Sequence, residues 1–248
     1  MDLLPRILIG CPTADVKADS LEAYVAGLNA LTYPNVDIVI EDNSANEKYA
    51  ERIQAHAKEW EKNHPGHTFR VIHSGNVSPR VRERIIHGRN VIRDIVLKEN
   101  YDYFFSLEQD IIPQKDVIEK LLAHRKDVVG GVYYNKVQLG GKMQLVPLLM
   151  IYPNEQMKQK NQAHWVGFTH LVPPRLIEVA SIGLGCVLIH RSVLEKISFR
   201  IRENDPAFDD MHFAIDLRQH GISMFADTGI TCEHRFNEAF RNVPDEEF

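Results

Sequence analysis

The chain has 248 residues, of which 44% are hydrophobic and 25% are charged, and its formal net charge is -5. This length and composition are typical of an ordinary globular protein whose core needs neither disulfides nor a structural metal. The negative net charge argues against a nucleic-acid partner held by a basic surface, and we expect none.

The three cysteines, Cys11, Cys186 and Cys232, lack the spacing of a zinc site, and their odd number favours a reducing compartment. No signal peptide precedes the first apolar segment. The longest apolar run, around Leu145 to Tyr152, contains a proline and is too short to span a bilayer. We therefore expect a cytoplasmic protein without a transmembrane segment, and peripheral membrane contact stays open.

The first half of the chain alternates apolar runs with amphipathic segments. Apolar runs that end in turn residues predict buried strands at Arg6–Gly10, Val36–Ile40, Phe69–Ile72 and Tyr101–Leu107. Apolar residues at helical spacing predict one helix that begins at Ser20 and another over Val81–Lys98, and Glu47–Asn63 is predicted to be a polar helix. This alternation predicts an α/β fold with a mainly parallel central sheet and helices on both faces.

Polar residues follow several of these strands, at the edge where α/β sheets bind their ligands. Glu108 and Asp110 are two residues apart, so their side chains are expected to converge while Gln109 faces away. Paired carboxylates suit Mg²⁺ or Mn²⁺, with diphosphate oxygens and water as further ligands. From spacing alone, acids that end a strand in a solvated turn are the commoner explanation.

The second half is less regular. Val128–Val137 and Met143–Tyr152 flank Gly140-Gly141, which predicts a hairpin, and Pro153–Arg175 is predicted to be a long loop. Trp165 in that loop is a candidate platform for an acceptor sugar, and an anchoring role for the loop is about as plausible. Further elements are expected at Gly185–His190 (strand), from Ser192 (short helix), from Asp209 or Asp210 to about His220 (helix) and at Met224–Ala226 (strand).

Asp209 and Asp210 stand at the start of the last predicted helix. One explanation is an N-cap with a first-turn acid that complements the helix dipole. The other is a general base held near a substrate. Both explanations can hold, one for each residue.

Six segments occur in an order that resembles GT-A glycosyltransferases, especially those of the broad family 2 type. They are Ile9–Thr13, Ile38–Ser44, Gly88–Asn90, Phe104–Asp110, Gly183–Arg191 and Phe208–Phe213, followed by His234. The resemblance covers Arg6 to about Phe236 and implies one GT-A domain over residues 1–248. Residues 1–112 would be the nucleotide-sugar-binding half, residues 113–240 the acceptor-binding half, and residues 241–248 a loose tail.

The resemblance also implies the activity of a hexosyltransferase. Such an enzyme moves a sugar from a UDP- or GDP-sugar to a hydroxyl of a carbohydrate or lipid-linked acceptor, with Mn²⁺ or Mg²⁺ as cofactor. Inversion is the preferred outcome, although retaining enzymes share the fold. The implied donor-binding residues are Pro12, Thr13, Asp42, Asn43, Arg89, Glu108 and Gln109.

The remaining implied roles concern the metal, the acceptor and the base. Asp110 would bind the metal directly, Glu108 through the ribose or a water, and His234 would complete these contacts. Gly185 and Trp165 would lie at the acceptor. Asp210 would deprotonate the acceptor hydroxyl. The chain has Asp-Asp where the family usually has Glu-Asp, so Asp209 and Asp210 can exchange roles.

Two other functions compete with this one. A sugar nucleotidyltransferase normally carries a glycine-rich loop with a basic residue after the first strand, and Cys11–Asp15 has neither. A non-catalytic carbohydrate-binding or scaffold protein on the same frame is expected to have lost its acids, yet Asp110, Asp209 and Asp210 are all present.

Overall fold

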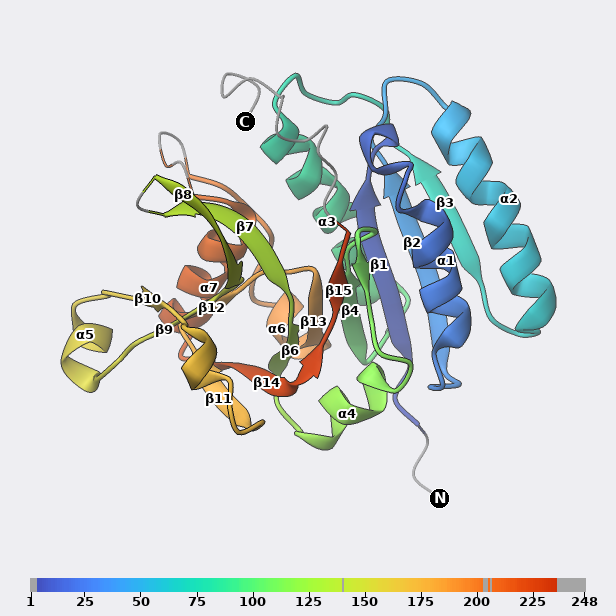
Figure 1. Cartoon of the computed structure of the whole chain (residues 1–248). Coiled ribbons are helices and arrows are strands. Elements are labelled where there is room, and N and C mark those ends of the chain that lie inside the picture. Colours follow the sequence, from blue (N-terminus) through green and yellow to red (C-terminus); the bar gives the residue numbers. More distant parts are fainter. Residues whose placement is uncertain (1–3, 140, 203–204, 206, 236–248) are drawn as a thin grey trace.

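The structure is a computed structural model that describes residues 4–139, 141–202, 205 and 207–235. Its centre is an eight-stranded sheet in the order β11-β14-β6-β13-β4-β1-β2-β3. Six of the strands are parallel, while β13 and β11 run antiparallel to their neighbours (Figure 1). In sheet order the strands are Leu176–Val179, Met224–Thr231, Val128–Val132, Cys186–His190, Tyr103–Leu107, Ile7–Thr13, Val36–Asp42 and Phe69–His73.

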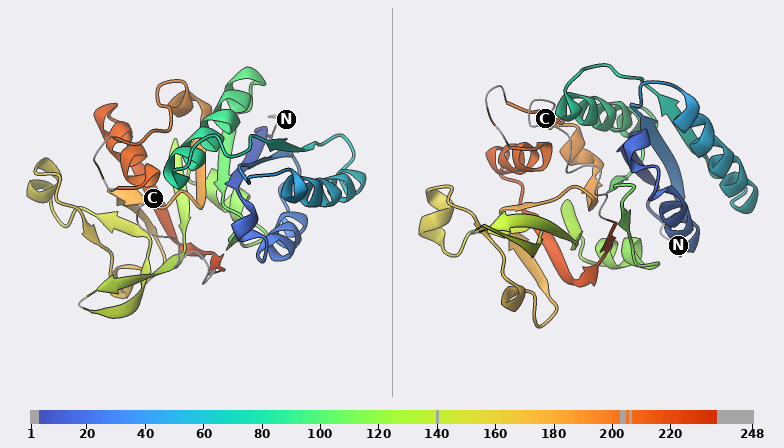
Figure 2. Two further views of the ribbon diagram at one scale, coloured as in Figure 1. Left: turned by 90° about the horizontal axis from the view of Figure 1, so that it is seen from above. Right: turned by 45° about the horizontal axis from the view of Figure 1, so that its top comes forward.

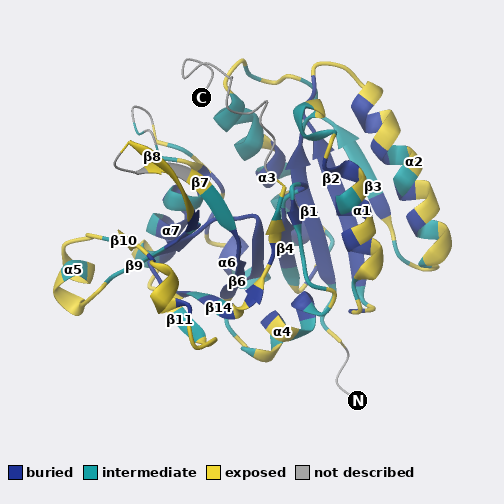
Figure 3. Cartoon of the chain, in the orientation of Figure 1, coloured by how far each residue is buried: buried dark blue, intermediate teal, exposed yellow. Residues whose placement is uncertain are grey.

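Helices cover both faces of this sheet, as two separate apolar clusters show. One face carries α1 (Leu21–Ala30), α2 (Lys48–Asn63) and α4 (Val117–Ala123). The other carries α3 (Val81–Lys98), α6 (Arg191–Leu194) and α7 (Asp209–Gln219). The prediction of a mainly parallel sheet between two helical layers is therefore confirmed. The central strands are buried along their length (Figure 3).

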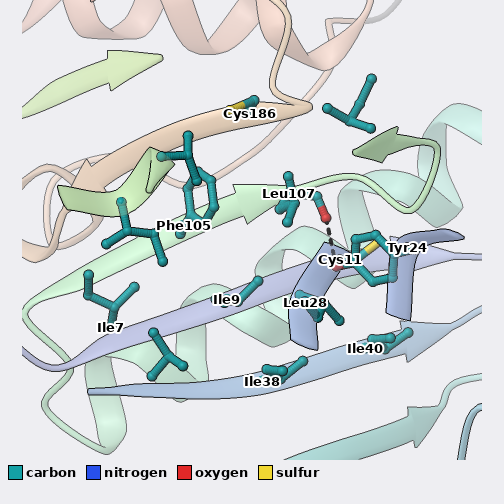
Figure 4. Packing of buried hydrophobic residues seen from close by; sticks show 14 of the residues in the cluster. Ile7, Ile9, Cys11, Tyr24, Leu28, Ile38, Ile40, Phe105, Leu107 and Cys186 are labelled. Atoms are coloured by element: carbon teal, nitrogen blue, oxygen red, sulfur yellow. Dashed lines mark hydrogen bonds between the residues drawn. The ribbon is translucent and has the colours of Figure 1, made fainter. Parts of the chain in front are cut away.

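The first-half elements form where the apolar pattern predicts them. Strands β1 and β2 are buried on both faces, which explains why their apolar residues run without alternation. On α1 the apolar residues at helical spacing face the sheet, and the Tyr24 hydroxyl donates a hydrogen bond of 3.0 Å to the Leu107 carbonyl (Figure 4). This contact fixes α1 against the end of β4.

The region from 128 to 152 differs from the predicted hairpin. Its first strand, β6, joins the central sheet, and only β7 (Tyr134–Leu139) and β8 (Lys142–Pro147) pair with each other. Then β9 (Leu149–Ile151) joins β10 (His164–Trp165) and β12 (Ser181–Ile182) in a small antiparallel sheet (Figure 2). Gly140 of the predicted turn lies outside the described residues.

The predicted loop at 153–175 also contains regular structure. It holds α5 (Glu155–Gln159), β10 and a 3₁₀ turn, η2 (Phe168–His170). A last small sheet pairs β5 (Ile111–Ile112) with β15 (Glu233–His234), and another 3₁₀ turn, η1 (Asp15–Lys17), follows β1. The predicted loose tail at 241–248 lies outside the described residues.

Gly88 sets how closely α3 approaches the ends of β1 and β2. A Cβ at this position would lie 2.8 Å from the Pro12 Cβ and closer still to the Glu41 carboxylate. We expect Gly88→Ala to destabilise the protein by about 1–3 kcal/mol, because α3 must move away from the sheet. Urea unfolding followed by circular dichroism measures the change.

The matched control is Gly27→Ala on α1, where the added Cβ would meet Ile112 and Pro113 at 3.3 Å. Alanine has a higher helix propensity than glycine by about 1 kcal/mol, which offsets this milder crowding. An equal loss of stability in both variants would contradict the close approach at Gly88.

Candidate active site

The candidate site lies at the carboxyl ends of three adjacent strands, β4, β1 and β2. Thr13 pairs with Asp42 across β1 and β2, and the Asn43 amide donates to the Thr13 carbonyl at 2.9 Å. On the other side of β4, the Glu108 amide donates to the Gly185 carbonyl at 3.0 Å. Parallel pairing therefore collects polar residues that are far apart in the sequence at one edge.

Gly185 must be small because the chain is crowded where β13 begins. A Cβ there would lie 2.8 Å from Ile111 and 2.9 Å from the Tyr133 ring. The Tyr133 hydroxyl accepts a hydrogen bond of 3.0 Å from the Gly185 amide. The glycine predicted at the acceptor side thus lies directly beside the Glu108 backbone.

Arg89 on α3 is the centre of a buried ion-pair network. Its guanidinium donates to Asp209, to Glu108 at 2.5 Å and to the Ser106 hydroxyl at 2.9 Å, and its side chain is 1% exposed. Burial alone would lower the pKa of Arg89, but the Asp209 and Glu108 carboxylates outweigh it and raise the pKa. The family resemblance implied that Arg89 binds the donor, whereas in the structure its guanidinium donates to these two carboxylates.

Asp110 is held between two basic side chains from distant segments. Lys17 Nζ lies 3.0 Å from its carboxylate and 3.7 Å from Glu108 Oε2. Pairing of β15 with β5 places His234 opposite Ile111, so that His234 Nε2 lies 3.7 Å from Asp110 Oδ2. Burial would raise the pKa of Asp110, but Lys17 and His234 together hold it below its usual range.

The three side chains predicted to hold a metal therefore lie near one another. His234 Nδ1 contacts the Tyr134 carbonyl at 2.7 Å, an arrangement that directs Nε2 toward Asp110 and is typical of metal-binding histidines. Among the described residues, no group of three His, Cys, Asp or Glu side chains is arranged to hold a metal by itself. Mg²⁺-type sites need only one or two carboxylates when substrate phosphates complete the shell. The Lys17 ammonium already occupies a cation position between the two acids, so the donor set fits such a metal.

Asp209 and Asp210 have different surroundings although they are neighbours on the first turn of α7. Asp209 is buried against Arg89, whereas Asp210 is partly exposed and makes no ion pair among the residues that the structure describes. Burial, and then the Asp209 charge, raise the pKa of Asp210 to about 7. A carboxylate whose pKa is raised toward neutral pH is typical of general acid–base sites.

The residues predicted to contact the nucleotide are mostly covered. Asp42 is fully buried and accepts hydrogen bonds from Ser44 and, at 2.8 Å, from the His73 ring. Asn43 and Thr13 are also buried, and Pro12 packs beside the Gly88 position.

Gln109 has no exposed surface from which to contact a nucleotide. Its amide nitrogen donates to the Tyr49 hydroxyl at 2.6 Å and to the Lys17 carbonyl at 2.6 Å, and its oxygen accepts from Thr13 at 2.7 Å. Gln109 therefore fastens the loop after β1 to the loop after β4, which fits the expectation that it faces away from the paired acids.

Trp165 does not join this cluster. It lies on β10 in the small sheet with its side chain 43% exposed, and β10 lies on the side of the molecule away from β1 and β2 (Figure 1).

Sequence reasoning missed three residues that shape the site: Lys17, Tyr133 and His73. Lys17 lies 93 positions before Asp110, and none of the three belongs to a motif. Only the apolar run of β6 before Tyr133 and the strand end before His73 offered a weak signal.

The fold is that of GT-A glycosyltransferases, as comparison with solved structures shows. One is Staphylococcus aureus TarS, residues 1–349, in complex with UDP-GlcNAc, with a TM-score of 0.58 and 12% sequence identity. Another is GalNAc-T7 with UDP, GalNAc and Mn²⁺, with a TM-score of 0.60 and 12% identity. The matches cover 96% of this chain but only 61% and 45% of those chains.

No protein-family model matches the sequence, and no curated protein matches it either. Within the described residues, no helix combines the length and apolarity needed to cross a membrane.

Removal of the Arg89 charge would take the ion-pair partner from the buried Asp209 carboxylate and leave Glu108 with the more distant Lys17. We expect Arg89→Met to lower the free energy of unfolding by about 3–5 kcal/mol, because breaking a buried ion pair leaves an uncompensated charge in the protein interior. Arg80→Met is the control, since the Arg80 pair with Glu83 is exposed and contributes at most about 1 kcal/mol. Equal stability of the two variants in urea unfolding would show that the network is not required.

Proposed function

We propose that this protein transfers a sugar from a nucleoside diphosphate donor, UDP- or GDP-linked, to a hydroxyl of a carbohydrate or lipid-linked acceptor. The observation that carries the proposal is the contrast between Asp209, paired with Arg89, and Asp210, whose pKa is raised to about 7 beside the acids of the donor motif. The GT-A fold supports the reaction class by analogy, and the arrangement of acids supports the chemistry.

On the donor side, the nucleoside would lie over the ends of β1 and β2, near Pro12, Thr13, Asp42 and Asn43. Asp42 would meet the base once the His73 ring moves aside, since this ring now occupies one carboxylate oxygen. The diphosphate would lie near Asp110 and Lys17.

The proposal includes a divalent metal, Mn²⁺ or Mg²⁺, because two carboxylates and an imidazole lie around one cation position. Asp110 and His234 would hold it, with Glu108 adjacent. The metal would neutralise the charge that develops on the departing nucleoside diphosphate. Arg89 acts behind this site, because its contact with Glu108 fixes the position of that carboxylate.

Asp210 would act as the general base. It accepts the proton of the acceptor hydroxyl while the hydroxyl oxygen forms a bond to the anomeric carbon. The bond from that carbon to the diphosphate oxygen breaks, and the nucleoside diphosphate leaves with the electron pair. A single displacement of this kind inverts the anomeric centre, and it needs the ionised form of the base, which for Asp210 predominates above about pH 7.

Nucleotide binding gives the first test of the function. We expect UDP or GDP to raise the thermal unfolding temperature, and to do so more strongly with Mn²⁺, because a ligand of the folded state stabilises it by mass action. AMP is the control nucleotide, since it lacks the diphosphate. An absence of any shift with UDP, GDP and their sugar conjugates would favour a non-catalytic carbohydrate-binding or scaffold protein.

Two substitutions, Asp210→Asn and Asp209→Asn, test the roles of the two neighbouring acids. Asp210→Asn should lower the release of nucleoside diphosphate from the donor, with water as acceptor, by at least about 100-fold, because it removes the base. Nucleotide binding should be unchanged. The wild-type rate should rise with pH with a midpoint near pH 7, the pKa of Asp210, and level off once Asp210 is fully ionised.

The same pair differs in stability. The folded-state pKa of Asp210 is higher than its usual value of about 4, so the folded state binds the proton more tightly and loses stability as pH rises from about 4 to about 7. At pH 8, Asp210→Asn should therefore be at least as stable as the wild type, whereas Asp209→Asn, which leaves Arg89 with a neutral partner, should be less stable. The reverse order in urea unfolding would exchange the roles of the two acids.

A further inference from the structure

Lys17 brings a cation to the paired acids of the candidate site. It ends η1, in the loop between β1 and α1, and its side chain is 15% exposed. Its carbonyl accepts hydrogen bonds from the Gln109 side chain at 2.6 Å and from the Ser20 hydroxyl and amide at 2.8 and 3.1 Å. The backbone is thus fixed at a point from which the lysine side chain reaches the site.

The Lys17 ammonium lies where a divalent metal would be expected. It is 3.0 Å from Asp110, the carboxylate that the proposed function assigns to the metal, and 3.7 Å from Glu108, the carboxylate adjacent to it. An ammonium and a dication cannot share this position, because like charges repel strongly at a few ångströms where water is scarce.

A permanent replacement of the metal by Lys17 conflicts with the local charge. The carboxylates of Glu108, Asp110 and Asp209 pair with two permanent cations, Lys17 and Arg89, and Asp110 also faces His234, which is charged only when protonated. With His234 neutral, as a metal ligand must be, these side chains carry a net charge of minus one. A donor diphosphate adds further negative charge. The single ammonium therefore cannot balance both the acids and the donor.

We propose that Lys17 holds the metal position in the donor-free protein and moves from the acids to the diphosphate when metal and nucleotide bind together. The inference rests on the proposed function. A lysine suits this exchange, because its ammonium is a point charge on a flexible four-carbon stem, so it can change partners while the backbone stays in place.

The exchange makes metal and nucleotide binding interdependent. Without a nucleotide, a metal must displace the ammonium from Asp110 and leave it without a diphosphate partner. With a nucleotide, the diphosphate supplies both oxygen ligands for the metal and a new partner for Lys17. Such coupling is reciprocal, so each ligand strengthens the binding of the other by the same factor.

Isothermal titration with MnCl₂ tests the role of Lys17, with electron paramagnetic resonance of free Mn²⁺ as a second readout. We expect Lys17→Met to bind Mn²⁺ alone at least about tenfold more tightly than the wild type, because the competing charge is gone. Lys17→Arg, which keeps the charge, should bind Mn²⁺ as weakly as the wild type. Lys62→Met removes an exposed lysine of α2 and should leave Mn²⁺ affinity unchanged.

The titrations are then repeated with saturating UDP or GDP. The factor by which the nucleotide tightens Mn²⁺ binding should be smaller in Lys17→Met than in the wild type. Equal Mn²⁺ affinity of wild type and Lys17→Met without nucleotide would overturn the inference. Nucleotide binding by the wild type that is equally tight in EDTA would also overturn it, since Lys17 would then replace the metal.

The outcomes for Lys17 and for the proposed function are separable. If neither UDP nor GDP binds the wild type under any condition, the glycosyltransferase proposal fails. The comparison of Mn²⁺ affinities without nucleotide still decides whether Lys17 competes with a metal at Asp110.

Discussion

The ion pairs of Arg89 constrain the rest of the site. One guanidinium on α3 contacts β4 through Ser106, the turn after β4 through Glu108, and the start of α7 through Asp209. Because this charge is almost fully buried, it is compatible with folding only when the carboxylates are in place. Three segments that are distant in the sequence must therefore assemble together, and their assembly also sets the position of Asp210.

The sequence predicted the first half of the fold well because local periodicity decides it. Strands such as β1 and β2 are apolar runs that end in turn residues, and helices such as α3 have a clear apolar face. The second half depends on long-range pairing instead. The chain from 128 to 152 changes partners near Tyr133 and Leu148, where the Leu148 amide donates to the Tyr133 carbonyl, and two-residue strands such as β12 and β15 carry no periodic signal.

In the candidate site, too, the sequence predicted the local features but not the long-range contacts. Glu108 and Asp110 were found because acids at a strand end are visible in the sequence, and the structure brings both to one ammonium. Their partners were not visible. Arg89 was assigned to the donor on resemblance, yet its guanidinium donates to Asp209 and Glu108, and nothing in the sequence links Lys17 to Asp110. Residue type and spacing predict chemical capacity, but only the tertiary structure decides which charges pair.

The pairing of cations with some acids and not with others distinguishes the proposed roles of these acids. Glu108, Asp110 and Asp209 each form an ion pair with Lys17 or Arg89. Asp210 has no such contact among the described residues, and its raised pKa reflects burial and the neighbouring Asp209 charge. A carboxylate whose pKa lies near neutral pH is suited to take a proton from a hydroxyl. In the proposed reaction, Lys17 and Arg89 would therefore lie on the side of the departing diphosphate and Asp210 on the side of the acceptor.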